Sequence, residues 1–166
     1  MGTRSLTVVM DGNKEILCMY RQMDGYIEGH GADLVAAFKG FKLTNGIAGD
    51  AKKTANGINC LAAQVVAHFK RITDENRKYA HDNGDGLEVG QFYLYAPETR
   101  EVGEEYIYRL SERDGRIWLD ISEGEVAWFG MPGTKPDLMD WIYSGWLDDL
   151  DPKADHGEVY HSRKRA

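Results

Sequence analysis

Residues 20 to 31 read Y-R-Q-M-D-G-Y-I-E-G-H-G, and the rest of the chain is arranged around this stretch. It combines three glycines with an arginine, a histidine, two tyrosines and two carboxylates. A strand-like apolar run precedes it, and a helix-like run follows it. We therefore expect a strand-to-helix connection that carries polar side chains, which is a common position for a ligand site.

The composition is that of a globular protein, with 166 residues, 42% hydrophobic and 11% aromatic side chains. We expect one domain over residues 1–150 and a flexible tail over residues 151–166. The net charge of −7 argues against extended nucleic acid as a partner, because coating a phosphate backbone needs a basic surface. No apolar run could span a bilayer and the N-terminus lacks a signal-peptide core, so we expect a cytoplasmic protein without a membrane partner.

Neither a metal nor another cofactor is expected. The two cysteines, Cys18 and Cys60, lie in apolar runs without metal-ligand spacing, which is typical of buried thiols. The acidic run from Asp82 to Asp85 lacks the alternating ligands and the closing Glu of an EF-hand, so an exposed loop is the better interpretation.

Two β-prone runs precede the central stretch, at Leu6–Met10 and Glu15–Gln22. Asp-Gly-Asn between them favours a tight hairpin, because these residues tolerate a positive φ. The second run has apolar residues on both faces, so we expect a central strand that becomes polar only at Arg21 and Gln22.

Helical spacing of apolar residues predicts helices over Ala32–Phe41 and Cys60–Ile72, with Asn59 as the N-cap of the second. Turn residues predict a loop over Thr44–Gly57, and the polar composition of Thr73–Gly90 predicts another.

The second half is rich in short strands separated by turn residues, the signature of an antiparallel meander. The four predicted strands are Gln91–Tyr95, Glu105–Leu110, Arg116–Ile121 and Glu125–Phe129. Pro136 then suits the first position of a C-terminal helix that runs through Ile142. The fold class is α+β: a mainly antiparallel sheet, made of the N-terminal hairpin and a four-strand meander, with two central helices and one C-terminal helix.

The central stretch has the features of a pocket for a small anion. Glycines on both sides of His30, just before a helix, would leave backbone amides open to a ligand. Arg21 could bind a phosphate or carboxylate, and Tyr26 could stack on a ring. With the loop between the helices as a second wall, the candidate ligand-binding residues are Arg21, Gln22, Asp24, Tyr26, Gly29, His30, Gly31, Asn45 and Asn56. The alternative is an ordinary tight connection in which Arg21 pairs with Asp24.

A catalytic interpretation of the same residues also stays open. His30 with Asp24 or Glu28 could supply a general base and its orienting carboxylate. No nucleophile elbow, zinc motif or paired-aspartate signature accompanies them, so we assign no catalytic residue and favour binding over catalysis.

Four motifs stand out: the opening G-T-R-S-L, the Y-R-Q-x-D-G-Y-x-x-G-H-G stretch, N-G-I followed by N-G-I-N-C-L-A-A-Q, and G-E-E-Y-I-Y. Together they resemble a small uncharacterised protein family of bacteria and their phages. The resemblance runs from Thr3 to about Tyr108. It brings no activity with it, but it implies a phage or bacterial setting, and the host cytoplasm if the protein is phage-encoded.

The leading hypothesis is a cytoplasmic protein that binds a small anionic or nucleotide-like ligand. In a phage setting, such a protein could counter host defence by sequestering a nucleotide-like immune signal, and a homo-oligomer with pockets between subunits would suit this role. Two alternatives remain. One is a small hydrolase of a phosphoester or glycosidic bond that uses His30 with Asp24 or Glu28. The other is a protein-interaction module that inhibits a host protein.

Overall fold

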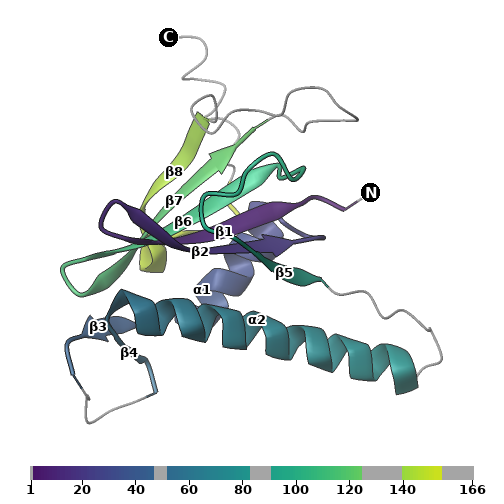
Figure 1. Cartoon of the computed structure of the whole chain (residues 1–166), viewed down its shortest axis with the longest axis horizontal. Coiled ribbons are helices and arrows are strands. Elements are labelled where there is room, and N and C mark those ends of the chain that lie inside the picture. The colour runs from purple at the N-terminus through teal and green to yellow at the C-terminus, as the bar shows by residue number, and fades with distance from the viewer. Residues whose placement is uncertain (1, 47–51, 83–90, 125–139, 155–166) are drawn as a thin grey trace.

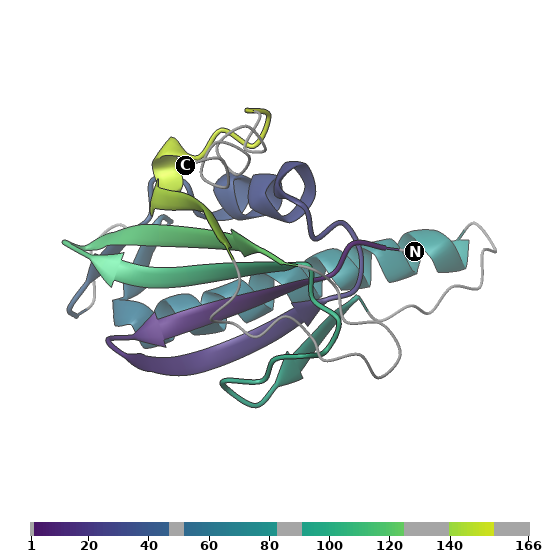
Figure 2. The ribbon, with the colours of Figure 1, turned by 90° about the horizontal axis from the view of Figure 1, so that it is seen from above.

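The computed structural model describes residues 2–46, 52–82, 91–124 and 140–154, with the backbone alone for 72–82 and 140. These residues form an α+β fold with a mixed six-stranded sheet and two α-helices (Figure 1). Figure 2 shows helix α1 and the segment that follows strand β5 on opposite sides of the sheet. No helix in the described parts of the chain has the length and apolarity needed to cross a membrane.

The predicted N-terminal hairpin is confirmed. Strand β1 (Ser5–Asp11) pairs antiparallel with β2 (Lys14–Arg21), and Gly12 takes a φ of +59° in the turn. Strand β2 lies between β1 and β5 in the sheet, so it is an interior strand as expected. Its side chains enter cores on both faces, with Met19 on the helix side and Cys18 on the other.

The predicted four-strand meander is wrong in its connections. Strand β5 (Phe92–Tyr95) pairs with β2, and β6 (Tyr106–Arg113) pairs parallel with β1 on the far side of the hairpin. Strand β7 (Arg116–Glu123) then pairs antiparallel with β6. The strand order is therefore β5-β2-β1-β6-β7-β8. The predicted strand Glu125–Phe129 lies outside the described residues.

The prediction of a C-terminal helix is also wrong for the part that lies in the described residues. Trp141 and Ile142 lie in strand β8 (Asp140–Trp146), which pairs antiparallel with β7. A register shift opposite Ile121 and Ser122 breaks the strict alternation of this strand, so its apolar residues imitate helical spacing. The rest of the predicted helix lies outside the described residues. A 3₁₀ turn, η3 (Leu147–Asp149), follows β8.

The first helix begins as predicted but is preceded by a wider turn. A π-helical segment, η1 (Ile27–Gly31), leads directly into α1 (Ala32–Phe38). Helix α1 ends before the predicted Phe41, because Lys39 leaves the helical conformation and Gly40 adopts a φ of +79°.

The second helix is longer than predicted. Helix α2 (Gly57–Asp82) begins two residues before Asn59, which therefore lies in its first turn and is not its N-cap. It also continues through residues 73–82, where the polar composition predicted a loop. Residues 83–90 of that predicted loop lie outside the described residues.

Two short strands form within and beside the predicted loop between the helices. Strand β3 (Lys42–Thr44) pairs parallel with β4 (Thr54–Asn56) in a separate two-stranded sheet. Side-chain alternation cannot show strands this short, because three residues define no period.

The main core lies between the helices and one face of the sheet. Its fully buried members are Val9, Leu34, Ala55, Leu61, Val65, Phe69, Tyr108, Leu110, Leu119, Ile121 and Leu147. A smaller core on the other face holds Leu6, Val8, Cys18, Tyr20 and Ile107 under Val102 of the segment 96–105. Arg100 fixes that segment to the sheet through a two-fold contact with the buried carboxylate of Glu15, at 3.1 and 2.6 Å.

Candidate functional site

Arg21, the predicted anion-binding residue, is buried and bonded within the protein. It stands at the end of β2 with only 6% of its surface exposed. Its Nη1 donates to Oδ2 of Asp33 at 2.5 Å and to Nδ1 of His30 at 3.0 Å, and its Nε donates to the Met23 carbonyl at 2.6 Å. The alternative pairing with Asp24 is wrong, since the ion pair is made with Asp33 in the first turn of α1.

His30 is fully buried in the core beneath β1. Its ring lies 4.9 Å from the Phe69 ring and 4.7 Å from the Tyr108 ring, between centroids. Arg21 can only donate, so Nδ1 of His30 must accept and the ring proton stands on Nε2, which contacts Thr7 Oγ1 at 2.5 Å. Burial, and secondarily the charge of Arg21, hold the pKa of His30 well below its usual range.

This environment contradicts the predicted acid–base pair. Both ring nitrogens of His30 are used, by Arg21 and Thr7, and neither the Asp24 nor the Glu28 carboxylate is among their partners. A neutral imidazole without solvent access has no path to a substrate. The catalytic interpretation of His30 is therefore not supported by the geometry.

The backbone amides of the stretch are also occupied, contrary to the predicted anion cradle. The N–H groups of Gly29 and His30 both donate to the Tyr26 carbonyl, at 3.1 and 2.9 Å. A Cβ on Gly29 would lie 2.4 Å from the Asp24 carbonyl oxygen, and one on Gly25 would lie within 3 Å of the β1 backbone. These glycines permit close packing of the chain on itself, and Gly31 lies buried at the junction with α1.

The remaining polar residues of the stretch lie near the surface. Tyr26 is 38% exposed and donates a hydrogen bond to Asp24 at 3.3 Å. Gln22 accepts one from the Tyr20 hydroxyl at 2.8 Å, on the sheet face away from the helices. The structure therefore does not gather these side chains around a cavity with Arg21.

Asn45 directly follows β3 and Asn56 ends β4, and these two strands lie at the opposite end of the main sheet from Arg21. The N–H of Leu43 in β3 donates to the carbonyl of Gly115 in the β6–β7 turn, whereas Arg21 lies level with the start of β6. Asn56 accepts a backbone N–H from the turn after β3 at 2.8 Å, so its role there is to fix that turn. The predicted second wall of the pocket is wrong.

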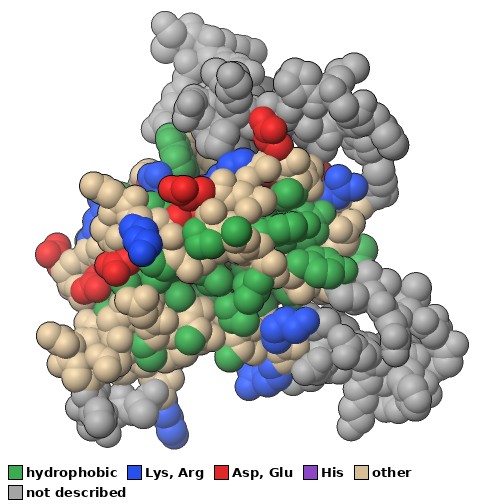
Figure 3. All heavy atoms as spheres, in the orientation of Figure 1, with side chains coloured by type: hydrophobic (Ala, Val, Ile, Leu, Met, Phe, Trp, Pro, Cys, Tyr) green, Lys and Arg blue, Asp and Glu red, His purple; other side chains and the backbone are tan. Residues whose placement is uncertain are grey.

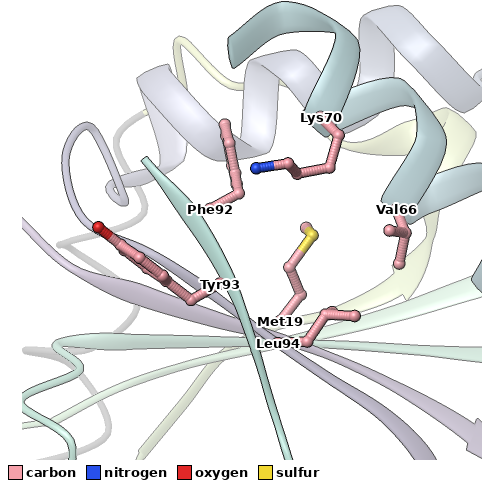
Figure 4. A pocket seen from close by; sticks show the side chains of 6 residues that line it. All are labelled: Met19, Val66, Lys70, Phe92, Tyr93 and Leu94. Carbon is pink, nitrogen blue, oxygen red and sulfur yellow. The ribbon is translucent and has the colours of Figure 1, made fainter. Parts of the chain in front are cut away.

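A pocket lies between α2 and β5, next to Arg21 (Figure 4). It has a volume of about 360 Å³ and is lined by Met19, Val66, Lys70, Phe92, Tyr93 and Leu94. This size lies within the range of roughly 300–1,000 Å³ that is usual for small-molecule sites.

The pocket has an apolar floor and a cationic edge. Met19 and Phe92 are almost completely buried, whereas the side chain of Leu94 is 59% exposed at the rim. Figure 4 shows the Lys70 side chain extending across the pocket toward Phe92. Lys70 forms no ion pair with any carboxylate of the described residues. The arrangement can therefore hold an apolar body and one negative charge.

Phe92 connects the pocket with the buried network of Arg21 and His30. One side of its ring faces the pocket; the Arg21 guanidinium lies 5.3 Å from the ring centroid, and the Phe69 ring lies 5.1 Å away. The Tyr20–Gly31 stretch thus supports the floor of the pocket. Sequence reasoning missed the pocket because its two walls are far apart in the chain. Val66 and Lys70 lie one helical turn apart on α2, and they face Phe92 and Leu94 of β5 across the pocket.

Among the described residues, no group of three or more His, Cys, Asp and Glu side chains is placed to hold a metal ion. Comparison of the chain with family models, curated proteins and solved structures gave no significant match.

Proposed function

We propose that the protein binds a small amphipathic anion in the pocket between α2 and β5. The observation that carries this proposal is an apolar pocket of ligand size with the single ammonium group of Lys70 across it. An apolar or aromatic ligand body would lie on Met19 and Phe92, and its carboxylate or phosphate would face Lys70.

The energetics favour such a ligand over a purely polar one. Removing apolar surface from water contributes roughly 25 cal/mol per Å², and the exposed rim at Leu94 adds surface that a ligand could cover. A charge on the ligand opposite Lys70 would fix its orientation. Capture of this kind requires affinity alone and no reacting group.

A nucleotide-like signal belongs to this ligand class, because it joins an aromatic base to a phosphate. The phage counter-defence hypothesis is therefore retained as a proposal, with the site moved from Arg21 to the α2–β5 pocket. The base would lie on Phe92 and Met19, because the Tyr93 ring packs at 6.0 Å from the Tyr20 ring on the other face of the sheet.

The test is displacement of a fluorescent apolar anion, 1-anilinonaphthalene-8-sulfonate, by a panel of medium-chain carboxylates and of cyclic and ADP-ribose-type nucleotides. Val66→Phe should fill the pocket and Lys70→Met should remove its charge, so both should weaken binding at least fivefold. Lys14→Met, which removes an exposed charge in the β1–β2 hairpin, is the matched control.

Two results would overturn the proposal: no probe binding to the wild type, or equal binding by all three variants. Ligand recovered after denaturation separates capture from hydrolysis, since a binding protein returns it intact and a hydrolase returns products.

A second candidate, protein interaction, is supported by the chemistry of β5. It is an edge strand of the described sheet with no charged residue, and Tyr93, Leu94 and Tyr95 are 46%, 59% and 40% exposed. Edge strands usually carry charges that oppose pairing with another chain. We infer that β5 could pair with a strand of a host protein or of a second copy.

Sedimentation velocity of the wild type and of Tyr95→Lys tests pairing with a second copy. Tyr95 lies on the sheet face away from the pocket, so this change should leave ligand binding intact. Self-association that the variant loses would support strand pairing and the proposed homo-oligomer. A wild type that stays monomeric at every concentration would exclude that homo-oligomer.

A further inference from the structure

Strands β6, β7 and β8 carry an unusual set of side chains on the face that points away from the helices. We call this set the Arg–Trp face; it consists of Arg109, Arg113, Arg116, Trp118, Trp141 and Trp146. Leu119 and Ile121 of β7 enter the helix-side core, so the alternate residues Trp118 and Asp120 point the other way. The segment 96–105 covers the neighbouring part of this face, over β1 and β2.

Each arginine of the face lies over the ring of a tryptophan. The guanidinium carbon is 4.3 Å from the ring centroid for Arg109 on Trp141 and 3.9 Å for Arg113 on Trp118. It is 4.3 Å for Arg116 on Trp146. Such cation–π contacts hold planar cations against indole rings at a partly exposed surface.

A buried carboxylate organises the centre of the face. Asp120 is 4% exposed and accepts hydrogen bonds from Trp118 Nε1 at 3.1 Å and from the Ser144 hydroxyl. Its other oxygen accepts from Nε and Nη2 of Arg109, at 3.1 and 2.9 Å. Because these bonds fix Trp118 and Arg109 from below, the Arg–Trp face is preorganised for binding.

The charges above this carboxylate are positive. Arg113 is exposed and forms no ion pair with a described carboxylate. The pair of Arg116 with Asp148 is long, at 3.5 Å, with both side chains partly exposed, and such pairs contribute little. On a chain of net charge −7, a surface with two accessible arginines is a local site for an anionic partner.

The geometry points to a partner with flat rings as well as negative charge. We propose that the Arg–Trp face binds a short segment of single-stranded nucleic acid. Bases can stack on guanidinium planes and on indole rings, and the phosphates between them can reach Arg113 and Arg116. Figure 3 views the molecule from the side away from α1 and shows basic and acidic side chains interspersed with hydrophobic ones.

The sequence argued against extended nucleic acid as a partner, and this proposal concerns only short single strands. The acidic chain still argues against coating a long duplex, whose bases are stacked on each other and cannot reach the rings of the Arg–Trp face. A few unstacked nucleotides need only the two accessible arginines and the rings beneath them. Binding should therefore be weak, selective for single strands and sensitive to salt.

The test is fluorescence anisotropy with labelled ten-nucleotide strands, dT10 and U10, in low salt, beside a labelled duplex and a labelled oligoglutamate. The wild type should bind the single strands and bind the duplex and the peptide at least fivefold more weakly. Arg113→Gln should weaken single-strand binding at least fivefold, the loss expected for one stacked base. Lys39→Gln, an equal charge change on an exposed residue after α1, should leave it unchanged.

Arg113→Lys separates stacking from charge alone. It keeps the cation but loses the planar group on Trp118, so we expect binding close to that of Arg113→Gln. Full rescue by lysine would indicate an anion site without stacking and would overturn the proposal. Absence of single-strand binding, equal binding of the duplex, or tighter binding of oligoglutamate would each overturn it as well. Val66→Phe should have no effect, which keeps this result independent of the ligand pocket.

Discussion

Nη1 of Arg21 donates to Nδ1 of His30 at 3.0 Å, and this contact sets the role of the whole Tyr20–Gly31 stretch. It consumes the cation that could have bound an anion and the ring nitrogen that could have accepted a proton from a substrate. Since Phe92 packs against the same guanidinium, the network is the rigid support behind the α2–β5 pocket.

Arg21→Met should destabilise the protein by about 3 kcal/mol, because it leaves the buried His30 ring nitrogen without its donor and Asp33 without its cation. Urea unfolding, compared with Arg71→Met on the exposed face of α2, measures this loss. If Arg21→Met were as stable as Arg71→Met but could not bind ligand, Arg21 would be part of the binding site after all.

His30 should make stability fall in weakly acidic solution. Its pKa is lowered in the folded state, so below the unfolded value of about 6.5 only the unfolded chain takes up the proton. Between pH 7.5 and 5.5 the wild type should lose about 1.4 kcal/mol more than His30→Gln. The charged neighbour is Arg21, which faces the ring, with Thr7, Phe69 and Tyr108 as uncharged contacts. Equal pH profiles of unfolding would contradict a neutral buried ring.

Gly29 and Gly31 should respond differently to the same substitution. Gly29→Ala places a methyl group 2.4 Å from the Asp24 carbonyl oxygen, a backbone atom, and should cost about 3 kcal/mol or more. Gly31→Ala meets the Ile27 side chain at 3.2 Å in a helical conformation, where alanine is favoured, so its effect should be close to zero. Thermal unfolding of the two variants tests the order; equal melting temperatures would contradict it.

Cys18 should resist thiol reagents in the folded protein. Burial, with the nearby Glu15 carboxylate as the second cause, raises the pKa of its thiol to about 12. The thiolate is the reactive form, so at pH 8 almost none is present. In a Cys60→Ser background, 5,5′-dithiobis(2-nitrobenzoate) should label the native chain far more slowly than the urea-unfolded chain. Fast labelling of the native chain would show that segment 96–105 leaves Cys18 accessible.

Local patterns in the sequence were sufficient to predict the elements that form through contacts between neighbouring residues. The Asp-Gly turn determined the N-terminal hairpin, and apolar spacing determined the positions of α1 and the first turns of α2. The strands β5, β6 and β7 also formed where β-prone residues alternate between turns. Each of these elements follows from contacts between residues that are near one another in the chain.

Pairing across long separations was decided only by the tertiary structure. Strand β6 lies beside β1 rather than β5 because segment 96–105 crosses the sheet and is fixed by Glu15, which no local pattern records. The sequence by itself marked residues 20–31 as the densest polar segment of the chain. Burial beneath β1 decided that its arginine and histidine satisfy each other, because polar groups removed from water must find partners inside the protein.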